Sequence, residues 1–361
     1  MEGLGLRAFY RGRRVFLTGH TGFKGAWLAW WLKELGAEVH GFALAPEDRR
    51  GNLFVQSGLA GALASTQGDL ADLEALSAAL DASGADTVLH LAAQPFVLRS
   101  YEEPVRTFLS NAQGTVHLLE AVRRVPRVRA AVVVTTDKCY ENDGSGRAFR
   151  EDDPLGGHDP YAASKAMAEL AVASYRRSFL AARGTGLASA RAGNVIGGGD
   201  YGADRILPDA VEAAAQGRPV PLRHPDAVRP WQHVLDALHG YLLLAARLHA
   251  DPAAHAEAYN FSPTEAGAPV TVLALVEGFL KELGRGSASV DPSTRRGAEA
   301  PTLSLDPARA RERLGWRSRL DVPAALRWTA EWHRTVMADP SAARDATLRQ
   351  IRAFMEMSGD D

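Results

Sequence analysis

The chain has 361 residues, and its 41 lysines and arginines against 43 aspartates and glutamates leave a formal net charge of −2. Hydrophobic residues make up 46% and charged residues 23%, ordinary globular values that exclude a disordered or fibrous chain. The near-neutral balance argues against a nucleic-acid-binding protein, and the single cysteine, Cys139, excludes a disulfide framework and a cysteine-rich zinc site.

Residues 1–14 contain four arginines and no apolar run, so they do not form a signal peptide. The longest uncharged stretch, residues 51–68, is interrupted by glycine and polar residues and is too polar to cross a bilayer. We therefore expect a soluble cytoplasmic protein with no membrane partner, no nucleic-acid partner and no bound metal.

In the first half of the chain, short apolar segments alternate with helical ones. The predicted strands are residues 14–19, 38–44, 87–91, 130–135 and 186–191; the predicted helices contain residues 27–32, 73–82, 115–124 and 160–180. This alternation predicts an α/β fold of Rossmann type, a doubly wound parallel sheet covered by helices on both faces.

Charge becomes denser after about Asp291, and the patterns there are shorter. We expect a smaller, mainly C-terminal α/β lobe that binds the substrate and does not continue the sheet. The predicted dinucleotide-binding domain covers residues 1–191, with residues 233–260 returning to it. Residues 192–232 and 261–361 form the substrate-binding lobe and the C-terminal helices.

A glycine-rich turn joins the first predicted strand to the first predicted helix. Residues 19–25 read Gly-His-Thr-Gly-Phe-Lys-Gly. Such glycines let backbone N–H groups approach a pyrophosphate at a helix N-terminus, where the helix dipole favours negative charge. A tight turn without a ligand is the alternative. The second strand ends without the acidic residue that usually binds the ribose, so this strand does not decide between NAD and NADP.

Tyr161 and Lys165 are spaced i, i+4 and share one face of a predicted helix. An ammonium group near a phenol lowers the phenol's pKa, and a tyrosine so tuned can take a proton from a sugar hydroxyl. In isolation the pattern would indicate an ordinary surface helix. The glycine turn and the polar end of the strand before Asp137 favour a catalytic site.

With these motifs the sequence resembles the nucleotide-sugar 4,6-dehydratases of the extended short-chain dehydrogenase/reductase superfamily over nearly the whole chain. The resemblance rests on the segments 19–25, 90–95, 111–115, 135–140, 153–157, 161–165, 192–200 and 229–233. It implies an NAD-dependent hydro-lyase that acts on a nucleotide sugar. Within the family the resemblance is to the branch that acts on CDP-glucose, and it implies a homodimer or a dimer of dimers.

The resemblance also assigns catalytic roles. Thr136 matches the hydroxyl beside Tyr161 that bonds the sugar C4 oxygen, and Asp137 matches the acid that protonates the departing C6 hydroxyl. Lys138 stands where other members have a glutamate base; it acts either as the C5 base or as an electrostatic stabiliser of the enolate.

Further residues match ligand-binding positions of the family. Asp69 fits a position where an acid meets the adenine, although it equally fits an N-cap for the helix after it. Asn194 and Arg229 fit contacts to the diphosphate, with a loop cap and a surface ion pair as their alternatives. The full set of implied cofactor contacts is Gly19, Thr21, Gly22, Phe23, Lys24, Gly25, Asp69, Leu70, Leu91, Ala92, Ala93, Tyr161 and Lys165. The implied substrate contacts are Gln94, Asn194, Arg229 and Arg296, with Arg295 beside it.

Two other functions remain open from the sequence. A nucleotide-sugar 4-epimerase needs the Thr, Tyr and Lys residues but no elimination acid, so Asp137 followed by Lys138 favours dehydration. A binding protein that responds to NAD without catalysis would be expected to lose Tyr161 or Lys165, and both are present. The helices starting at Pro160 and Thr115 could pair across a two-fold axis, as in the family's dimers.

Overall fold

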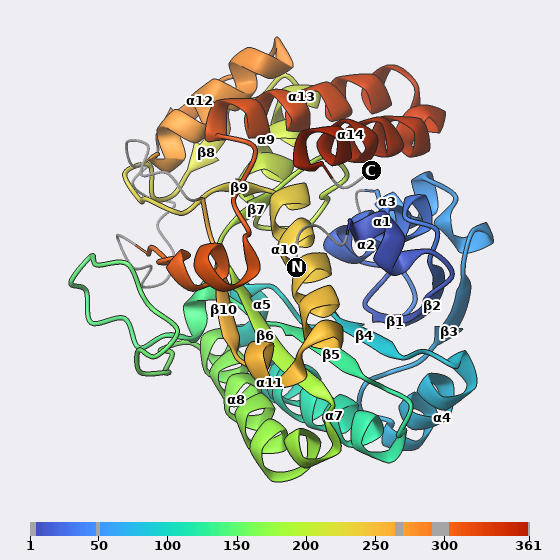
Figure 1. Cartoon of the computed structure of the whole chain (residues 1–361). Coiled ribbons are helices and arrows are strands. Elements are labelled where there is room, and N and C mark those ends of the chain that lie inside the picture. The colour runs from blue at the N-terminus through green and yellow to red at the C-terminus, as the bar shows by residue number, and fades with distance from the viewer. Residues whose placement is uncertain (1–4, 48–50, 264–269, 291–302, 360–361) are drawn as a thin grey trace.

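The computed structural model describes residues 5–47, 51–263, 270–290 and 303–359. Its centre is a seven-stranded, fully parallel sheet with the strand order β10-β6-β5-β4-β1-β2-β3 (Figure 1). The predicted doubly wound α/β fold is confirmed. The chain order reverses between β1 and β4, and ligands of such sheets bind outside the strand ends at this reversal.

The strands of the sheet are β1 (Arg14–Thr18), β2 (Glu38–Ala43), β3 (Ala64–Gln67), β4 (Thr87–His90), β5 (Ala130–Val134), β6 (Gly186–Ala192) and β10 (Ala258–Phe261). The helices of this half are α1 (Leu6–Tyr10), α2 (Phe23–Glu34), α3 (Leu53–Gln56), α4 (Leu73–Ser83), α5 (Val97–Glu102), α6 (Pro104–Phe108), α7 (Gly114–Arg124), α8 (Pro160–Tyr175), α10 (Val234–Ala250) and α11 (Pro252–His255). Short turns of 3-10 or π geometry are η1 (Leu59–Gly61), η2 (Leu109–Gln113), η3 (Asp137–Cys139), η4 (Arg176–Leu180) and η5 (Ala181–Arg183).

The two faces of the sheet have separate cores, and the residues of β5 alternate between them. Val132 and Val134 join the core that contains α2 and α10, whereas Ala131 and Val133 join the core that contains α4 and α7. Successive side chains of a strand point to opposite faces, so a strand with helices on both sides is apolar throughout.

The rest of the chain forms a smaller lobe over the carboxyl ends of the strands (Figure 1). It contains β7 (Val195–Ile196), β8 (Val220–Leu222), β9 (Gln232–His233), β11 (Ala288–Val290), α9 (Ile206–Ala215), α12 (Val272–Leu283), η7 (Ala310–Leu314), α13 (Val322–Ala338), η8 (Pro340–Ala342) and α14 (Ala343–Ser358). Its strands pair as β11-β8 and β7-β9 and do not extend the large sheet. A core of its own joins α9, α12 and α13.

Several elements differ from the sequence prediction, which also lacked strand β10 of the large sheet. The helix predicted to end at Leu180 ends as α8 at Tyr175 and continues as the π turn η4. Strand β3 was not predicted, because Ala64–Gln67 lies at the sheet edge and is mostly exposed and polar. The domain boundaries proposed from the sequence remain a prediction.

No helix within the described ranges is long and apolar enough to cross a membrane. The same residues contain no group of three or more histidine, cysteine or acidic side chains placed to hold a metal ion.

Candidate active site at the carboxyl ends of the strands

In the glycine turn between β1 and α2, each glycine is required, or allowed, for a different physical reason. Gly19 has a φ of +78°, and a Cβ there would lie 2.6 Å from the backbone nitrogen of Ala92. A Cβ on Gly25 would lie 2.0 Å from the carbonyl oxygen of Gly19. Gly22 is exposed, and a Cβ there would meet nothing closer than 3.5 Å. Gly19 and Gly25 therefore close the turn, while Gly22 leaves the N-terminus of α2 open to a ligand.

The rest of the turn is tied to the neighbouring strand ends. The Thr21 hydroxyl donates to the carbonyl of Leu44, just after β2, over 3.1 Å. The Thr18 hydroxyl accepts a 3.2 Å hydrogen bond from the backbone of Ala92. Residues 91–93, expected to contact the cofactor, thus lie beside the turn at the reversal of the sheet.

At the expected adenosine end, Asp69 is exposed and its carboxylate accepts a 2.9 Å bond from the N–H of Ala71. The N-cap of α4 is Asp72, whose side chain accepts from Ala75, so Asp69 forms a local turn and does not cap the helix. Leu70 is buried in the core under α4 and α7. The described chain after β2 holds Glu47, and its carboxylate is paired with Arg99 at 3.0 Å.

Helix α8 places Tyr161 in its first turn, where Asp159 is the N-cap and Pro160 is at N1. The ring is 9% exposed, and burial raises the pKa of Tyr161 to about 12, although the hydroxyl of Thr136 acts in the opposite direction. We expected Lys165 to lower the pKa of this phenol. In the ligand-free chain, burial outweighs the nearby positive charges, so the phenol is protonated at neutral pH.

Lys165 lies one turn further along α8 and donates a 3.1 Å hydrogen bond to the carbonyl of Val134, the last residue of β5. Burial lowers the pKa of Lys165 to about 8, although Glu169 opposes the shift. Lys24, from the glycine turn, is in the same electrostatic environment. Burial and the positive charges of Arg205 and Lys165 lower the pKa of Lys24 to about 7.

Asp137 follows Thr136 at the end of β5 and is 3% exposed. One carboxylate oxygen accepts a 3.0 Å hydrogen bond from the Thr136 hydroxyl. Oδ2 is buried without a hydrogen-bond partner among the described residues and faces Gly193. Burial raises the pKa of Asp137, although Lys138 and Arg229 counteract part of the effect. A buried carboxyl with a raised pKa and an unpaired oxygen suits a group that gives a proton to a ligand.

The residues predicted to contact the substrate differ in burial and in hydrogen bonding. Arg229 is 5% exposed and lies near Asp137, which does not fit a surface ion pair. Asn194 is half-buried, and its backbone carbonyl accepts a 3.0 Å hydrogen bond from the N–H of Gln232. The side chain of Gln94 holds its own loop, donating to Thr107 over 2.9 Å and accepting from the backbone of Phe96 over 2.6 Å. Arg295 and Arg296 lie outside the described residues.

Arg205 was not among the sequence candidates, although it contributes to the electrostatics of both Tyr161 and Lys24. It pairs with Asp200 at 3.0 Å and its guanidinium lies 5.4 Å from the ring centre of Phe96. The sequence offered only a weak signal, an arginine in a polar loop after the Gly-Gly-Gly-Asp segment.

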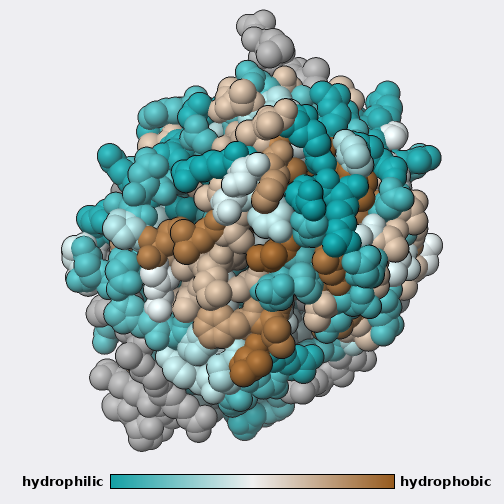
Figure 2. Space-filling model, turned by 90° about the horizontal axis from the view of Figure 1, so that it is seen from below, coloured by the Kyte–Doolittle hydropathy of each residue, from teal (hydrophilic) through white to brown (hydrophobic). Residues whose placement is uncertain are grey.

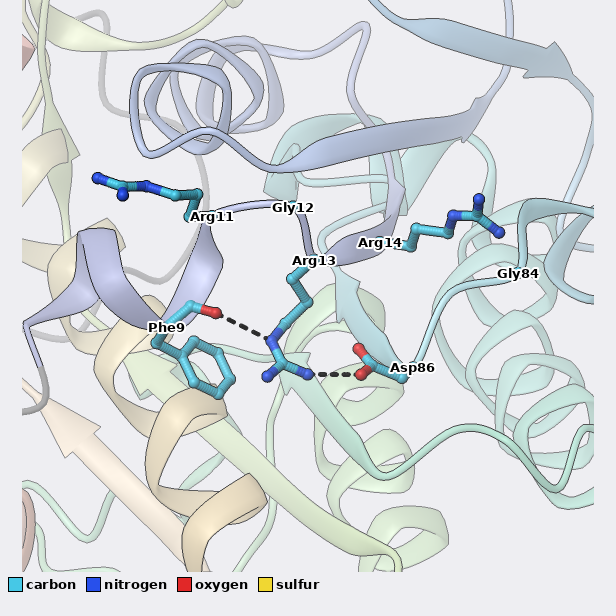
Figure 3. Close-up of a pocket in the computed structure, with 7 residues that line it drawn as sticks. All are labelled: Phe9, Arg11, Gly12, Arg13, Arg14, Gly84 and Asp86. Carbon is cyan, nitrogen blue, oxygen red and sulfur yellow. Dashed lines mark hydrogen bonds and ion pairs between the residues drawn. The ribbon is translucent and has the colours of Figure 1, made fainter.

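A pocket of about 350 Å³ opens on the opposite side of the sheet from the candidate site, at the amino ends of strands β1 and β4. Figure 3 shows Arg13 between Phe9 and Asp86, with Arg11 and Arg14 pointing to either side. Arg13 is paired with Asp86 at 2.5 Å and Arg14 with Glu38 at 3.0 Å. The predicted catalytic residues all lie near the carboxyl ends of the strands, so this pocket is separate from the candidate site.

Comparison with known proteins identifies the family of this chain. The model of the GDP-mannose 4,6 dehydratase family matches residues 16–329, which include the sheet and most of the lobe. The chain therefore belongs to this family, and the resemblance found in the sequence motifs is confirmed.

Its similarities among individual proteins are more specific. The chain is 42% identical to the CDP-glucose 4,6-dehydratase of Salmonella typhimurium (strain LT2) over 332 residues, covering 90% of this chain and 92% of that one. It is 32% identical to a dTDP-glucose 4,6-dehydratase of Streptomyces antibioticus, over 74% of this chain and 75% of that one. Among solved structures, a dTDP-glucose 4,6-dehydratase from Streptomyces venezuelae with NAD bound superposes with a TM-score of 0.73 at 26% identity, covering 91% of this chain and 99% of that chain.

Proposed function

We propose that this chain is an NAD-dependent CDP-glucose 4,6-dehydratase, which converts CDP-D-glucose to CDP-4-dehydro-6-deoxy-D-glucose. The observation that carries the proposal is the near full-length similarity to a CDP-glucose 4,6-dehydratase, at ten percentage points more identity than the dTDP-glucose relative. The buried Asp137 beside Tyr161 supports the dehydratase chemistry, because elimination needs an acid that oxidation alone does not.

The residues around the glycine turn fit NAD, which solved relatives contain. Gly22 leaves open space at the N-terminus of α2, where backbone N–H groups suit a diphosphate. NAD would accept a hydride from the sugar C4 and return it to C6. The described end of β2 offers no unpaired carboxylate to the ribose, since Glu47 is paired with Arg99.

In the first half of the reaction, Tyr161 takes the proton of the C4 hydroxyl while Thr136 holds the C4 oxygen. The ammonium of Lys165 and the positive charge of the oxidised cofactor stabilise the phenolate that this step requires. Burial raises the pKa of Tyr161 to about 12, so a phenolate at this position needs positive charge beside it.

In the second half, Asp137 gives its proton to the C6 hydroxyl as water leaves. The unpaired Oδ2 is the atom free to do so. Lys138, which is half-buried and next to Asp137, supports loss of the C5 proton, as a base or by stabilising the enolate. The amide of Asn194 and the guanidinium of Arg229 are suited to the diphosphate of the substrate.

A 4-epimerase is the second candidate, because a UDP-glucose 4-epimerase from Thermus thermophilus with NAD superposes with a TM-score of 0.76 at 27% identity, covering 89% of this chain and 99% of that chain. Exchange of the C5 hydrogen with solvent separates the two reactions, since an epimerase leaves C5 untouched.

The test is a parallel assay of CDP-, dTDP-, UDP- and GDP-glucose with added NAD, following the 4-keto sugar by absorbance and C5 deuterium uptake by mass spectrometry. We expect 4-keto-6-deoxy product with CDP-glucose and much slower turnover with the other three. A clear preference for another base would overturn the substrate assignment. A C4 epimer without deuterium uptake would overturn the reaction.

We also propose that the enzyme is a cytoplasmic homodimer formed through an apolar patch on neighbouring helices α5, α6 and α8. The patch consists of Tyr101, Val105, Leu109, Met167 and Leu170, which are 49–71% exposed. The sequence suggested a pairing of α7 with α8. The patch instead combines α8 with α5, α6 and the turn η2, all of which precede α7. The face seen in Figure 2, below α7 and α8, also carries hydrophobic residues toward its centre and hydrophilic ones around its rim.

A further inference from the structure

A buried carboxylate lies directly behind the candidate catalytic residues. Glu169 is four residues after Lys165 on α8, so both side chains lie on the same face of the helix. Glu169 is 3% exposed. One of its oxygens accepts from the hydroxyl of Thr135, and the other accepts from the Ser189 hydroxyl over 2.7 Å and from the Arg191 guanidinium over 2.8 Å.

The Glu169–Arg191 pair joins the segments that carry the catalytic residues. Thr135 directly precedes Thr136 at the end of β5, and Arg191 lies on β6 two residues before Gly193, which faces Asp137. Arg191 also donates a 2.8 Å hydrogen bond to the hydroxyl of Tyr140, just after η3. The buried ion pair therefore connects three segments that meet at the site: the end of β5, the end of β6 and the residue after η3.

The ionisation of Glu169 is well supported. Burial alone would raise its pKa, but Arg191 and the two hydroxyls hold it below the ordinary value. The carboxylate in turn opposes the lowering of the Lys165 pKa by burial.

Other ionisable groups facing Lys165 come from four elements. His90 of β4 has its pKa lowered by burial to about 3, and burial raises the thiol pKa of Cys139 in η3, so both are neutral. Lys24, at the start of α2, adds a like charge below its pKa of about 7. On α8 itself, Tyr161 is neutral in the free chain. Glu169 is thus the anionic side chain that acts on Lys165.

We propose that Glu169 is a positioning residue for Lys165: paired with Arg191, it holds α8 against the ends of β5 and β6 and supplies the negative charge that keeps the Lys165 ammonium protonated. This assignment rests on the proposed function for the role of Lys165 in hydride transfer. The charge relation itself is a property of the free protein and can be measured without turnover.

The test compares the full-length protein with its Glu169→Gln variant, using NMR of lysine labelled with ¹³C at Cε and assigning the signal with Lys165→Arg. Glu169 lies one helical turn from Lys165, and losing an opposite charge within about 4–6 Å changes a pKa by about 1–3 units. We expect the proton affinity of Lys165 to fall at least about tenfold, so that Lys165 loses its proton at lower pH. The alkaline limb of the pH profile for NAD reduction by substrate should move down by the same amount.

Two further variants separate charge from architecture. Glu169→Asp keeps the carboxylate and should leave the Lys165 titration close to the wild-type one. Glu151→Gln alters another buried carboxyl of the same region, which accepts a 2.8 Å hydrogen bond from the backbone N–H of Asn260. It should lower stability without moving the Lys165 titration.

If Glu169→Gln does not fold, the double variant Glu169→Gln with Arg191→Met removes both charges and leaves neither unpaired. A smaller downward shift is expected there, because loss of the Arg191 positive charge offsets part of the loss of the carboxylate. An unchanged Lys165 titration in a folded variant without the carboxylate overturns the proposal, whatever the activity. A shifted titration in a protein that turns over no nucleotide sugar supports the proposal and rejects the proposed function alone.

Discussion

Tyr161 is the proposed general base, on the evidence of its spacing from Lys165, its burial and its position beside Thr136. In Tyr161→Phe the ring keeps its packing but cannot take the C4 proton. We expect turnover to fall by about 10²–10⁴-fold, the usual contribution of a general base, while the dissociation constant of NAD stays within a factor of a few. Steady-state kinetics and NAD titration by fluorescence check this. A near-wild-type rate would remove Tyr161 from the mechanism.

Lys138 and Asp137 should be separable from the oxidation step. Lys138→Ala is expected to reduce bound NAD when CDP-glucose is added and then to stall, with slow deuterium uptake at C5. Asp137→Asn should also oxidise C4 but lose the C6 hydroxyl slowly, since an amide cannot donate a proton as a carboxylic acid does. Stopped-flow absorbance of the reduced cofactor and mass spectrometry of the sugar measure both halves.

Native product formation and native C5 exchange in Lys138→Ala would exclude Lys138 as the base. Failure of the same variant to reduce NAD would mean that Lys138 positions the substrate or tunes Tyr161.

At the level of elements, the glycine turn offers a matched pair of substitutions. Gly25→Ala would bring a Cβ to 2.0 Å from the Gly19 carbonyl, so the turn must shift and we expect a clearly lower melting temperature. Gly22→Ala meets no atom within 3.4 Å and should fold with a melting temperature close to that of the wild type. Its methyl group would occupy the space expected for the diphosphate, so NAD should bind at least about tenfold more weakly.

Calorimetry of the NAD-free proteins and NAD titration of the Gly22→Ala variant make the comparison. Unchanged NAD affinity in that variant would place the diphosphate away from this turn.

The elements with strong local signals were the ones predictable from sequence. The apolar run of β5 and the glycine turn were found because burial on both faces and close backbone approach restrict residue type. Neither edge strand was found, because β3 is mostly exposed and polar and β10 is a buried run of only four residues. Tertiary pairing was also hidden: Glu169 has the right spacing from Lys165, but its partner Arg191 is 22 residues away on β6.

Some site residues show roles that sequence could not resolve. Gln94 looked like a substrate contact, yet its amide is fully engaged in holding the loop after β4. For Arg229 the sequence favoured a diphosphate contact over a surface ion pair, and its burial near Asp137, which sequence does not reveal, argues against the surface pair.

For the whole molecule, the apolar patch on α5, α6 and α8 predicts the oligomeric state. Leu170 is 60% exposed and Val105 is 71% exposed. The double variant Leu170→Lys with Val105→Lys should be monomeric by light scattering while the wild type is a dimer. Met357→Lys, at an exposed apolar position on α14, is the matched control and should remain a dimer. A wild-type monomer, or a dimeric double variant, would contradict the patch as the interface.

Helix α14 returns to α2, the first helix after the glycine turn. Arg352 of α14 pairs with Glu34 of α2 at 2.7 Å, and the rings of Phe354 and Trp31 meet edge to face. The two helices, far apart in the sequence, thus share one hydrophobic core. The face of α2 that carries Trp31 can be covered only after α14 has been synthesised, more than 300 residues later. We therefore expect this face of α2, with Trp31, to stay exposed in a nascent chain that does not yet contain α14.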